Sequence, residues 1–160
     1  MMADATGRAA IARLLAGHRT LTLATSHQGR PWAATVFYAS DAAFNLFFVS
    51  DPRTRHARDM AVDPRVALCI DADAGGWDEV RGLQIEGEAM QLAEAERPAA
   101  LALYLARFPD VQALHARPET ADEQLIARRL QHTPFWRVKP RLIRLLDSAH
   151  GFGWKWELQL

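Results

Sequence analysis

Five stretches rich in alternating and β-branched residues, separated by short polar turns, constrain the fold of this chain most. They occupy about residues 20–25, 31–40, 44–50, 66–70 and 82–92, and a sixth stretch, broken around Pro140, covers 135–138 and 142–147. Alternation of this kind is typical of β-strands. The turns between the first three stretches are too short for a crossover, so we expect these three to form an antiparallel meander.

The turn between the first two stretches, residues 27–30, reads His-Gln-Gly-Arg. Its glycine, Gly29, stands at the position that most often needs a positive φ. The second stretch carries apolar residues on both faces, with Trp32 on one and Phe37 on the other, so we expect it to be buried on both sides. Six antiparallel strands fit a small barrel closed on itself, because closure removes exposed strand edges.

Apolar residues at helical spacing predict helices over about residues 5–16, 55–61, 94–107 and 120–130. Thr54 can cap the second of these, and Pro109 and Pro118 interrupt the segment between the last two. The last residues, 154–160, are expected to form a short aromatic tail. The predicted fold class is therefore α+β, a six-stranded antiparallel barrel with flanking helices, and residues 1–160 are expected to form a single domain.

Charge and cysteine content argue against several classes of protein. The chain has 19 basic and 19 acidic residues, whereas a general nucleic-acid binder would need an excess of positive charge. Cys69 is the single cysteine, so neither an internal disulfide nor a cysteine-rich zinc site is expected. No apolar run approaches the roughly 18 residues of a membrane span, and residues 1–15 lack the apolar core of a signal peptide. We expect a cytoplasmic protein without nucleic-acid or membrane partners.

The familiar catalytic and metal-binding motifs are missing from the sequence. It contains no Gly-x-Ser-x-Gly elbow, no His-x-x-x-His pair, and neither a Gly-x-Gly-x-x-Gly nor a Walker loop. The six histidines are scattered along the chain, where surface and capping roles are the common ones. The sequence therefore predicts no metal ligand and identifies no catalytic residue.

Positive charge gathers in the segment 51–58, where a predicted strand meets the start of a helix. Its basic residues are Arg53, Arg55, His56 and Arg58. The exposed amides of a helix N-terminus together with cations can bind phosphate, and the hydroxyl of Thr54 would add a donor. The alternative is an ordinary helix cap with solvated surface arginines, which is the more common arrangement.

Tryptophan is abundant in this chain. The five residues are Trp32, Trp77, Trp136, Trp154 and Trp156. Core and interface packing is the usual role of each one taken singly. Trp154 and Trp156 follow a glycine loop, so they suit a wall beside a planar ligand or a dimer contact better than a buried core.

The order and spacing of these segments resemble the pyridoxamine 5′-phosphate oxidase-like FMN-binding split barrels, and in particular a small bacterial branch of that group. The similarity runs from the first helix to the C-terminus and is carried by residues 21–25 (LTLAT), 29–32 (GRPW), 47–56 (FFVSDPRTRH), 63–68 (DPRVAL) and 82–88 (GLQIEGE). It implies a Greek-key split β-barrel that works as a homodimer, with FMN at the interface between the two chains.

The resemblance also implies where the cofactor lies. The flavin ring would run along the second strand, and its phosphate would be held by Thr54-Arg55-His56, which matches a Ser/Thr-Arg-Lys motif of the family. The implied cofactor contacts are Thr35, Val36, Phe37, Ser50, Arg53, Thr54, Arg55, His56, Gln84 and Trp156. The phosphate site predicted from the segment 51–58 and the family pattern therefore converge on the same residues.

Two departures from the family pattern weaken the implied phosphate site. His56 replaces the lysine of the motif, and Ala34 stands where many members have a basic residue. Fewer fixed charges predict weaker FMN binding, for which Arg53 or Arg58 would compensate. Deazaflavin binders and haem-degrading proteins share this fold, so both cofactors remain alternatives to FMN.

Three functions follow from this reading. The first is an FMN-dependent oxidoreductase acting on a small molecule, with the chemistry supplied by the flavin. The second is a non-catalytic dimer that binds or senses a flavin or haem. The third is a split-barrel dimer that has lost its cofactor and acts through protein contacts.

Overall fold

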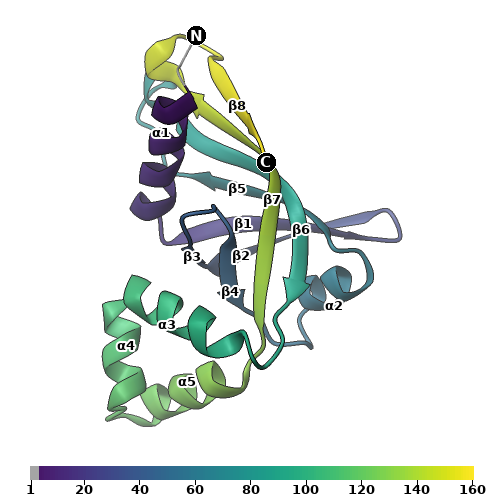
Figure 1. Cartoon of the computed structure of the whole chain (residues 1–160), viewed down its shortest axis with the longest axis vertical. Helices are drawn as coiled ribbons and strands as arrows, with labels where there is room; N and C mark the ends of the chain where they lie inside the picture. The colour runs from purple at the N-terminus through teal and green to yellow at the C-terminus, as the bar shows by residue number, and fades with distance from the viewer. Residues whose placement is uncertain (1–3) are drawn as a thin grey trace.

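The structure, a computed structural model, describes residues 4–160 and shows an α+β protein built on one curled antiparallel sheet (Figure 1). The strands are β1 (Thr20–His27), β2 (Arg30–Phe37), β3 (Ala39–Ser40), β4 (Leu46–Val49), β5 (Arg65–Asp71), β6 (Arg81–Gln91), β7 (Phe135–Asp147) and β8 (Lys155–Gln159). The helices are α1 (Asp4–Gly17), α2 (Arg55–Val62), α3 (Arg97–Arg107), α4 (Pro109–Ala116) and α5 (Ala121–His132), with short 3-10 turns at Trp77–Glu79 and Ser148–His150. No helix among the described residues is long and apolar enough to cross a bilayer.

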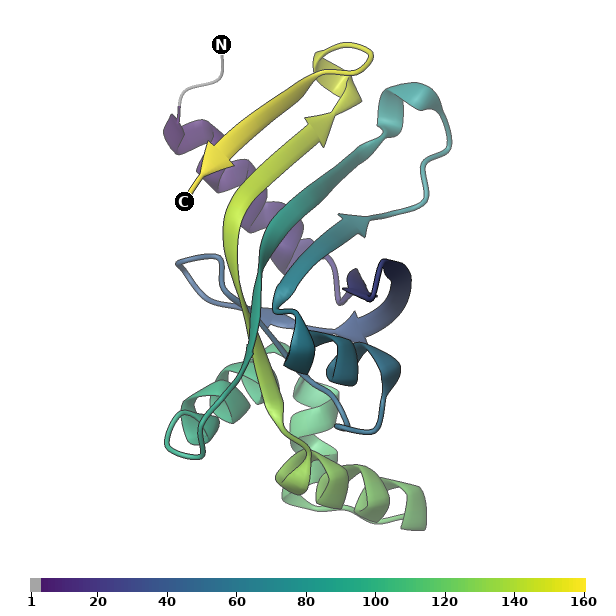
Figure 2. The same ribbon diagram turned by 90° about the vertical axis from the view of Figure 1, so that its right-hand side faces the viewer.

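The strands follow the order β2-β1-β5-β6-β7-β4-β3, and every pair is antiparallel. Strand β7 pairs with β6 along one edge, while its other edge pairs first with β4 and then with β8. Figure 2 shows β6 and β7 as two long, bent strands that run side by side through the molecule. The predicted fold class, an antiparallel split barrel of the α+β type, is thus confirmed.

The predicted number of six strands is wrong, because residues 4–160 form eight. Residues 155–159 pair with β7 as a regular strand and are not a loose tail. The second predicted strand is divided at Tyr38 into β2 and β3. The Tyr38 amide donates to the carbonyl of Arg19, and its hydroxyl donates to the carbonyl of Leu15 at 2.8 Å.

The first two strands form the predicted hairpin, and both residues of its tight turn have positive φ, 51° at Gln28 and 74° at Gly29. This is the pattern of a type I′ turn. The predicted pairing of the second and third strands is confirmed only at their near ends, where Ala39 and Ser40 of β3 pair with β4, whereas β2 itself pairs with β1 alone.

Strand β2 is therefore an edge strand, with no partner on its outer side within residues 4–160. The sheet is curled but not closed, and the predictions of a closed barrel and of a strand buried on both sides are wrong. The side chains of Trp32 and Phe37 are 43% and 55% exposed. The outer backbone edge of β2 is free to bind something other than a strand of the same chain.

Strand β7 runs unbroken through Pro140, where a break was expected. The register with β6 shifts at this point, so that Glu86 pairs with Leu142 and Gly87 pairs with Pro140. A Cβ atom on Gly87 would come within 2.6 Å of the Lys139 carbonyl oxygen. The register shift and the missing side chain at Gly87 together allow Pro140, which has no amide hydrogen to donate, to lie within the strand.

The helices lie close to their predicted positions, with one addition. Thr54 caps α2 as predicted, since its hydroxyl accepts from the amide of Ala57. Helix α4 was not expected, because Pro109 was taken as an interruption, whereas it occupies the first position of this helix. Proline is well tolerated there, because that amide has no partner within the helix.

Two hydrophobic clusters organise the interior. The larger lies inside the curl of the sheet, and the smaller joins α3 and α5 to strands β3, β4 and β7. The smaller cluster includes Phe47, Tyr104, Phe108, Leu130 and Phe135. It fixes α3–α5 at the end of the sheet where β4 meets α2, so these helices form one wall of the site described below (Figure 1).

Candidate cofactor site

Three polar side chains meet where β4 leads into α2. The Oγ atom of Ser50, which is buried, lies 3.0 Å from the Oγ1 atom of Thr54 and 2.7 Å from the Nε2 atom of His56. Thr54 donates its proton to the carbonyl of Asp51 at 2.8 Å. Ser50 can then donate to Thr54 while His56 donates to Ser50, so the cluster fits an imidazole that carries its proton on Nε2.

The environment of His56 favours its neutral form in the free protein. Burial lowers the pKa of His56 below the ordinary histidine value, and the nearby Asp59 carboxylate offsets only part of this effect. At neutral pH the cluster therefore carries no fixed positive charge, and its hydroxyls can donate to a ligand by turning away from their internal partners.

A pocket of about 290 Å³ opens in front of this cluster. Its lining combines Ser50, Thr54 and His56 with Thr35, Val36 and Phe37 of β2, and Val49, Asp51 and Tyr104 complete it. Six of the ten predicted cofactor residues thus face one space. Tyr104 was not predicted, because helical spacing does not reveal that α3 packs beside β3 and β4 and reaches this pocket.

None of the three arginines of the predicted phosphate segment, Arg53, Arg55 and Arg58, lines this pocket. Arg53 binds Asp51 through several contacts, the closest at 2.6 Å, and its side chain is 85% exposed. This pairing holds the pKa of the Asp51 carboxyl well below its usual range. Arg55 lies on a different face of α2, 4.5 Å from the ring centre of Trp32. The expectation that Arg53 and Arg55 contact the cofactor stays a prediction.

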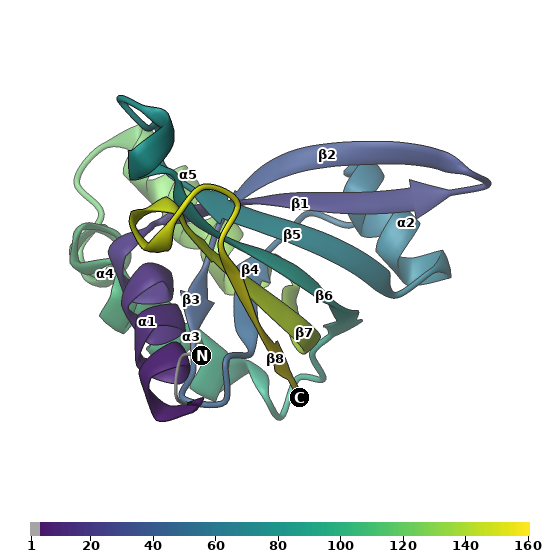
Figure 3. The same cartoon turned by 90° about the horizontal axis from the view of Figure 1, so that it is seen from above.

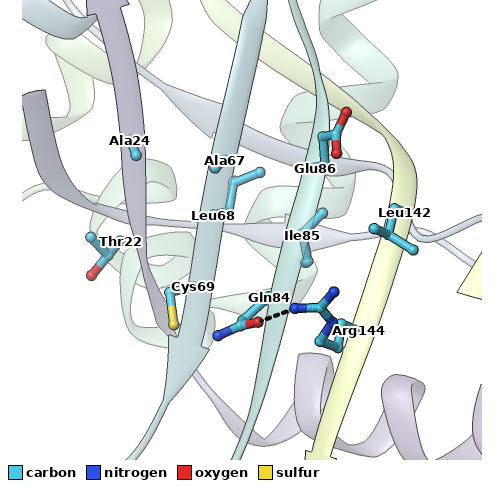
Figure 4. Close-up of a pocket in the computed structure, with 10 residues that line it drawn as sticks. All are labelled: Thr22, Ala24, Ala67, Leu68, Cys69, Gln84, Ile85, Glu86, Leu142 and Arg144. Carbon is cyan, nitrogen blue, oxygen red and sulfur yellow. Dashed lines mark hydrogen bonds between the residues drawn. The ribbon is translucent and has the colours of Figure 1, made fainter. Parts of the chain in front are cut away.

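Gln84 and Trp156 also lie away from the cluster within one chain. Figure 4 shows Gln84 on the outer face of the sheet, beside Arg144, which donates to it at 3.3 Å. This face holds a shallow pocket of about 410 Å³ across β1, β5, β6 and β7. Trp156 packs against α1 at Gly7, and both Trp154 and Trp156 are partly buried against the larger core. The expectation that they form a wall beside a ligand or a dimer contact stays a prediction.

A second, mostly apolar pocket of about 370 Å³ adjoins the first. The two share Phe37, Val49, Ser50, Asp51 and Tyr104, so they open onto each other. Helices α4 and α5 provide the rest of its wall, with Val111, Ile126, Arg129, Leu130 and Thr133. These residues could not be predicted from the sequence pattern, because α4 was not expected and the position of α5 depends on long-range packing.

The residues present fit the hydrogen-bonding needs of a flavin mononucleotide. The unpaired edge of β2 can meet the polar edge of a planar ring, while the Ser50 cluster and the first amides of α2 can meet a phosphate. The joined apolar pocket gives a flat ring room beside Phe37 and Tyr104. The Ser50 cluster itself lacks a fixed positive charge, since burial lowers the pKa of His56 and Arg55 faces elsewhere, while Arg129 lines only the adjoining pocket.

Comparison with known proteins agrees with this architecture. The "UPF0306 protein YhbP" of Salmonella paratyphi A is 31% identical over 147 residues, which cover 91% of this chain and 88% of that protein. A heme-binding protein from Mycobacterium smegmatis matches 95% of this chain and 57% of its own, with a TM-score of 0.68 and 22% identity. An FAD-binding protein from Mesorhizobium loti matches 82% of this chain and 88% of its own, with a TM-score of 0.62 and 17% identity.

The sequence also matches a family profile directly. The profile described as pyridoxamine 5′-phosphate oxidase aligns with residues 8–137, a span that contains the edge strand, the Ser50 cluster and helices α2–α5. The chain therefore belongs to the pyridoxamine 5′-phosphate oxidase family.

Proposed function

We propose that this protein binds FMN and acts as a flavin-dependent oxidoreductase on a small molecule. The observation that carries the proposal is the meeting of two features in one pocket. The hydrogen-bonded cluster of Ser50, Thr54 and His56 lies across from the unpaired edge of β2. A phosphate and a planar polar ring, joined in one ligand, match these two features.

Each part of the site has a role in this proposal. When bound, the flavin supplies the electron transfer, so the protein needs no strong acid or base of its own. The backbone of residues 35–37 orients the ring, and Ser50, Thr54 and His56 hold the phosphate. Phe37 and Tyr104 form apolar walls that keep water from the reacting face.

A homodimer with the cofactor at the interface is part of the proposal. Gln84 and Trp156 lie away from the Ser50 cluster in one chain, so they would reach its ligand only from a second copy. The exposed edge of β2 and the outer face of the sheet in Figure 4 are the surfaces that such a partner would cover. Light scattering should then give twice the chain mass of 17.9 kDa.

A cytoplasmic location is also proposed, because the lone Cys69 is a free thiol.

The second candidate is a non-catalytic protein that binds a flavin or haem. The observation in its favour is the neutral imidazole of His56 on the pocket wall, since this is the form in which histidine binds haem iron. The heme-binding protein of Mycobacterium smegmatis shares this fold.

The deciding experiment is an absorbance spectrum after adding FMN and removing the excess on a desalting column. We expect retained bands near about 370 and 450 nm that bleach with dithionite or a nicotinamide donor. Ser50→Ala should lose most of the retained flavin, whereas Ser26→Ala, on the exposed side of β1, should not. Retained flavin that no donor reduces, or uptake of haem or a deazaflavin in place of FMN, would support the second candidate.

A further inference from the structure

The apolar pocket next to the Ser50 cluster is lined by hydrophobic side chains that are in contact with water. Phe37 of β2 and Ile126 of α5 are 55% and 45% exposed, whereas Tyr104 and Leu130 are its buried lining residues. Its volume of about 370 Å³ lies within the range of small-molecule sites. An apolar ligand in this space would cover the exposed side chains, which is favourable because it removes them from water.

One face of α5 supplies polar groups to the same pocket. Four residues at or near the C-terminal end of this helix line it: Ile126, Arg129, Leu130 and Thr133. Their spacing of three and four residues places them on one face of the helix. Arg128 lies on another face and does not line the pocket. A guanidinium and a hydroxyl, four residues apart, therefore lie beside an apolar surface.

The C-terminal end of α5 is held by a different arginine. Arg97 of α3 donates to the carbonyls of Leu130 and Thr133, to the second of them at 2.6 Å. These bonds satisfy carbonyl groups that the helix leaves free, and they place a positive charge at its end. Arg129 is not needed for either role, and it forms no ion pair within residues 4–160.

The charges around this pocket leave one positive charge without a counterpart. Asp51 also lines the pocket, but Arg53 binds its carboxylate at 2.6 Å, so these two charges cancel. The hydrogen bonds from Arg53 are the main reason for the low pKa of Asp51, and Arg129 adds a smaller attraction, so its guanidinium lies near this carboxylate. One free charge matches a carboxylate. A phosphate monoester carries about −1.5 to −2 at neutral pH and would be repelled more strongly by Asp51.

We propose that this pocket binds a small carboxylic acid with an apolar body, and that such an acid is the substrate class of the site. Its carboxylate would accept hydrogen bonds from Arg129 and Thr133, and its body would pack against Phe37 and Ile126. The inference rests on the proposed function, because it takes the adjoining pocket as the place of the flavin. It adds a substrate class and a residue that determines specificity, Arg129.

The first test uses cinnamate, an aromatic carboxylate, and its uncharged amide, cinnamamide, in calorimetry with the full chain. We expect cinnamate to bind about tenfold more tightly, because only cinnamate can form a charge-assisted hydrogen bond with Arg129. Arg129→Gln should abolish this preference by weakening cinnamate alone. The matched control Arg128→Gln removes the same charge from the next residue of α5, and it should keep the preference. Both arginines are exposed, so circular dichroism should show a native fold in each variant.

A second pair of variants tests the apolar lining. Ile126→Ser should weaken cinnamate and cinnamamide alike, by about fivefold, because less apolar surface is covered. The control Leu125→Ser changes a residue of α5 that is 43% exposed and does not line the pocket, so it should have no effect. If Ile126→Ser lowered the assembly mass in light scattering and left both affinities unchanged, this face would be a protein interface and the proposal would be overturned.

The spectrum of retained FMN separates failure of this inference from failure of the proposed function. Protein that keeps FMN but binds no cinnamate at millimolar concentration, or binds cinnamate and cinnamamide equally, would overturn the substrate class and leave FMN binding in place. Phenyl phosphate that binds as tightly as cinnamate, or cinnamate that displaces FMN, would also overturn it. An Arg129-dependent preference in a protein that never takes up flavin would overturn the proposed function, and the assignment of the acid as substrate with it.

Discussion

The imidazole Nε2 atom of His56 lies 2.7 Å from the hydroxyl oxygen of Ser50, and both side chains face the pocket at the edge of β2. In the free protein, burial keeps this imidazole largely neutral at pH 7. A phosphate group placed against Ser50 and Thr54 would draw a proton onto His56, because the anion stabilises the imidazolium. His56 would thus become positively charged when a phosphate binds, whereas a lysine at this position would be charged with or without the ligand.

FMN affinity should fall as pH rises from 6 to 8.5. The pKa of His56 lies below its ordinary value in the free protein and should be raised in the complex, so binding takes up a proton between these two values. Affinity is then lost as pH rises through the pKa of the complex. Quenching of flavin fluorescence at each pH measures this dependence. In His56→Gln the profile should flatten, and a flat profile in the wild type would show that His56 does not contact the phosphate.

His56→Lys should strengthen FMN binding and remove its pH dependence. A charged donor contributes about 1 kcal/mol more than a neutral one, which corresponds to about fivefold in affinity. The matched control is His132→Lys, which adds the same charge at an exposed position on α5. An equal increase in FMN affinity in both variants would show that the effect comes from the overall charge of the protein and not from a charge in the pocket.

Local signals in the sequence were enough to predict that Ser50 and Thr54 lie close together in this site. Thr54 stands just before a helical pattern and caps α2 as expected, and Ser50 ends the preceding strand, so their proximity follows from short-range geometry. Local signals could not show that the side chains of Arg55 and His56, although adjacent in sequence, face different pockets. Neighbouring helical residues point about 100° apart, and which of them faces the pocket depends on how the helix packs. That packing brings α2 against the β1–β2 hairpin (Figure 3) and includes the Thr25–Asp59 hydrogen bond, whose partners are 34 residues apart.

The same difference between local signals and long-range packing explains the errors in the predicted fold. The alternating pattern of residues 31–37 predicts a strand correctly, yet it does not show that β4 will pair with β7 and leave β2 at the edge. The apolar residues of β2 were therefore taken as buried on both sides, although Phe37 is more than half exposed. Apolar character at an edge strand is itself a sign of a binding surface, once the pairing of the strands is known.

Thr25→Val should destabilise the protein by about 1–3 kcal/mol. The substitution leaves the buried carboxylate of Asp59 without its 2.9 Å hydrogen bond, and an unsatisfied buried group costs that much. Urea unfolding of both proteins measures the change in the free energy of unfolding. Thr22→Val, on the exposed side of the same strand, should stay within about 0.5 kcal/mol of the wild type. Similar values for both variants would mean that the Thr25–Asp59 bond does not anchor α2.

Gly7→Ala should destabilise the protein although it improves the helix propensity of α1. Alanine stabilises a helix interior by about 1 kcal/mol relative to glycine. A Cβ atom at Gly7, however, would lie within 3.0 Å of three ring atoms of Trp156, and overpacking of this kind costs about 1–3 kcal/mol. The control is Gly17→Ala in the same helix, where the added Cβ meets nothing within 4 Å, so this variant should be at least as stable as the wild type.

A double-mutant cycle identifies the source of the Gly7 effect. Trp156→Leu removes the large ring, so Gly7→Ala should cost less stability in that background than in the wild type. Urea unfolding of the four proteins measures the coupling. If Gly7→Ala stabilises the protein as much as Gly17→Ala does, the ring of Trp156 does not pack on α1 in solution. Trp156 would then be free to reach the cofactor of its own chain, and a second copy would not be needed to bring it there.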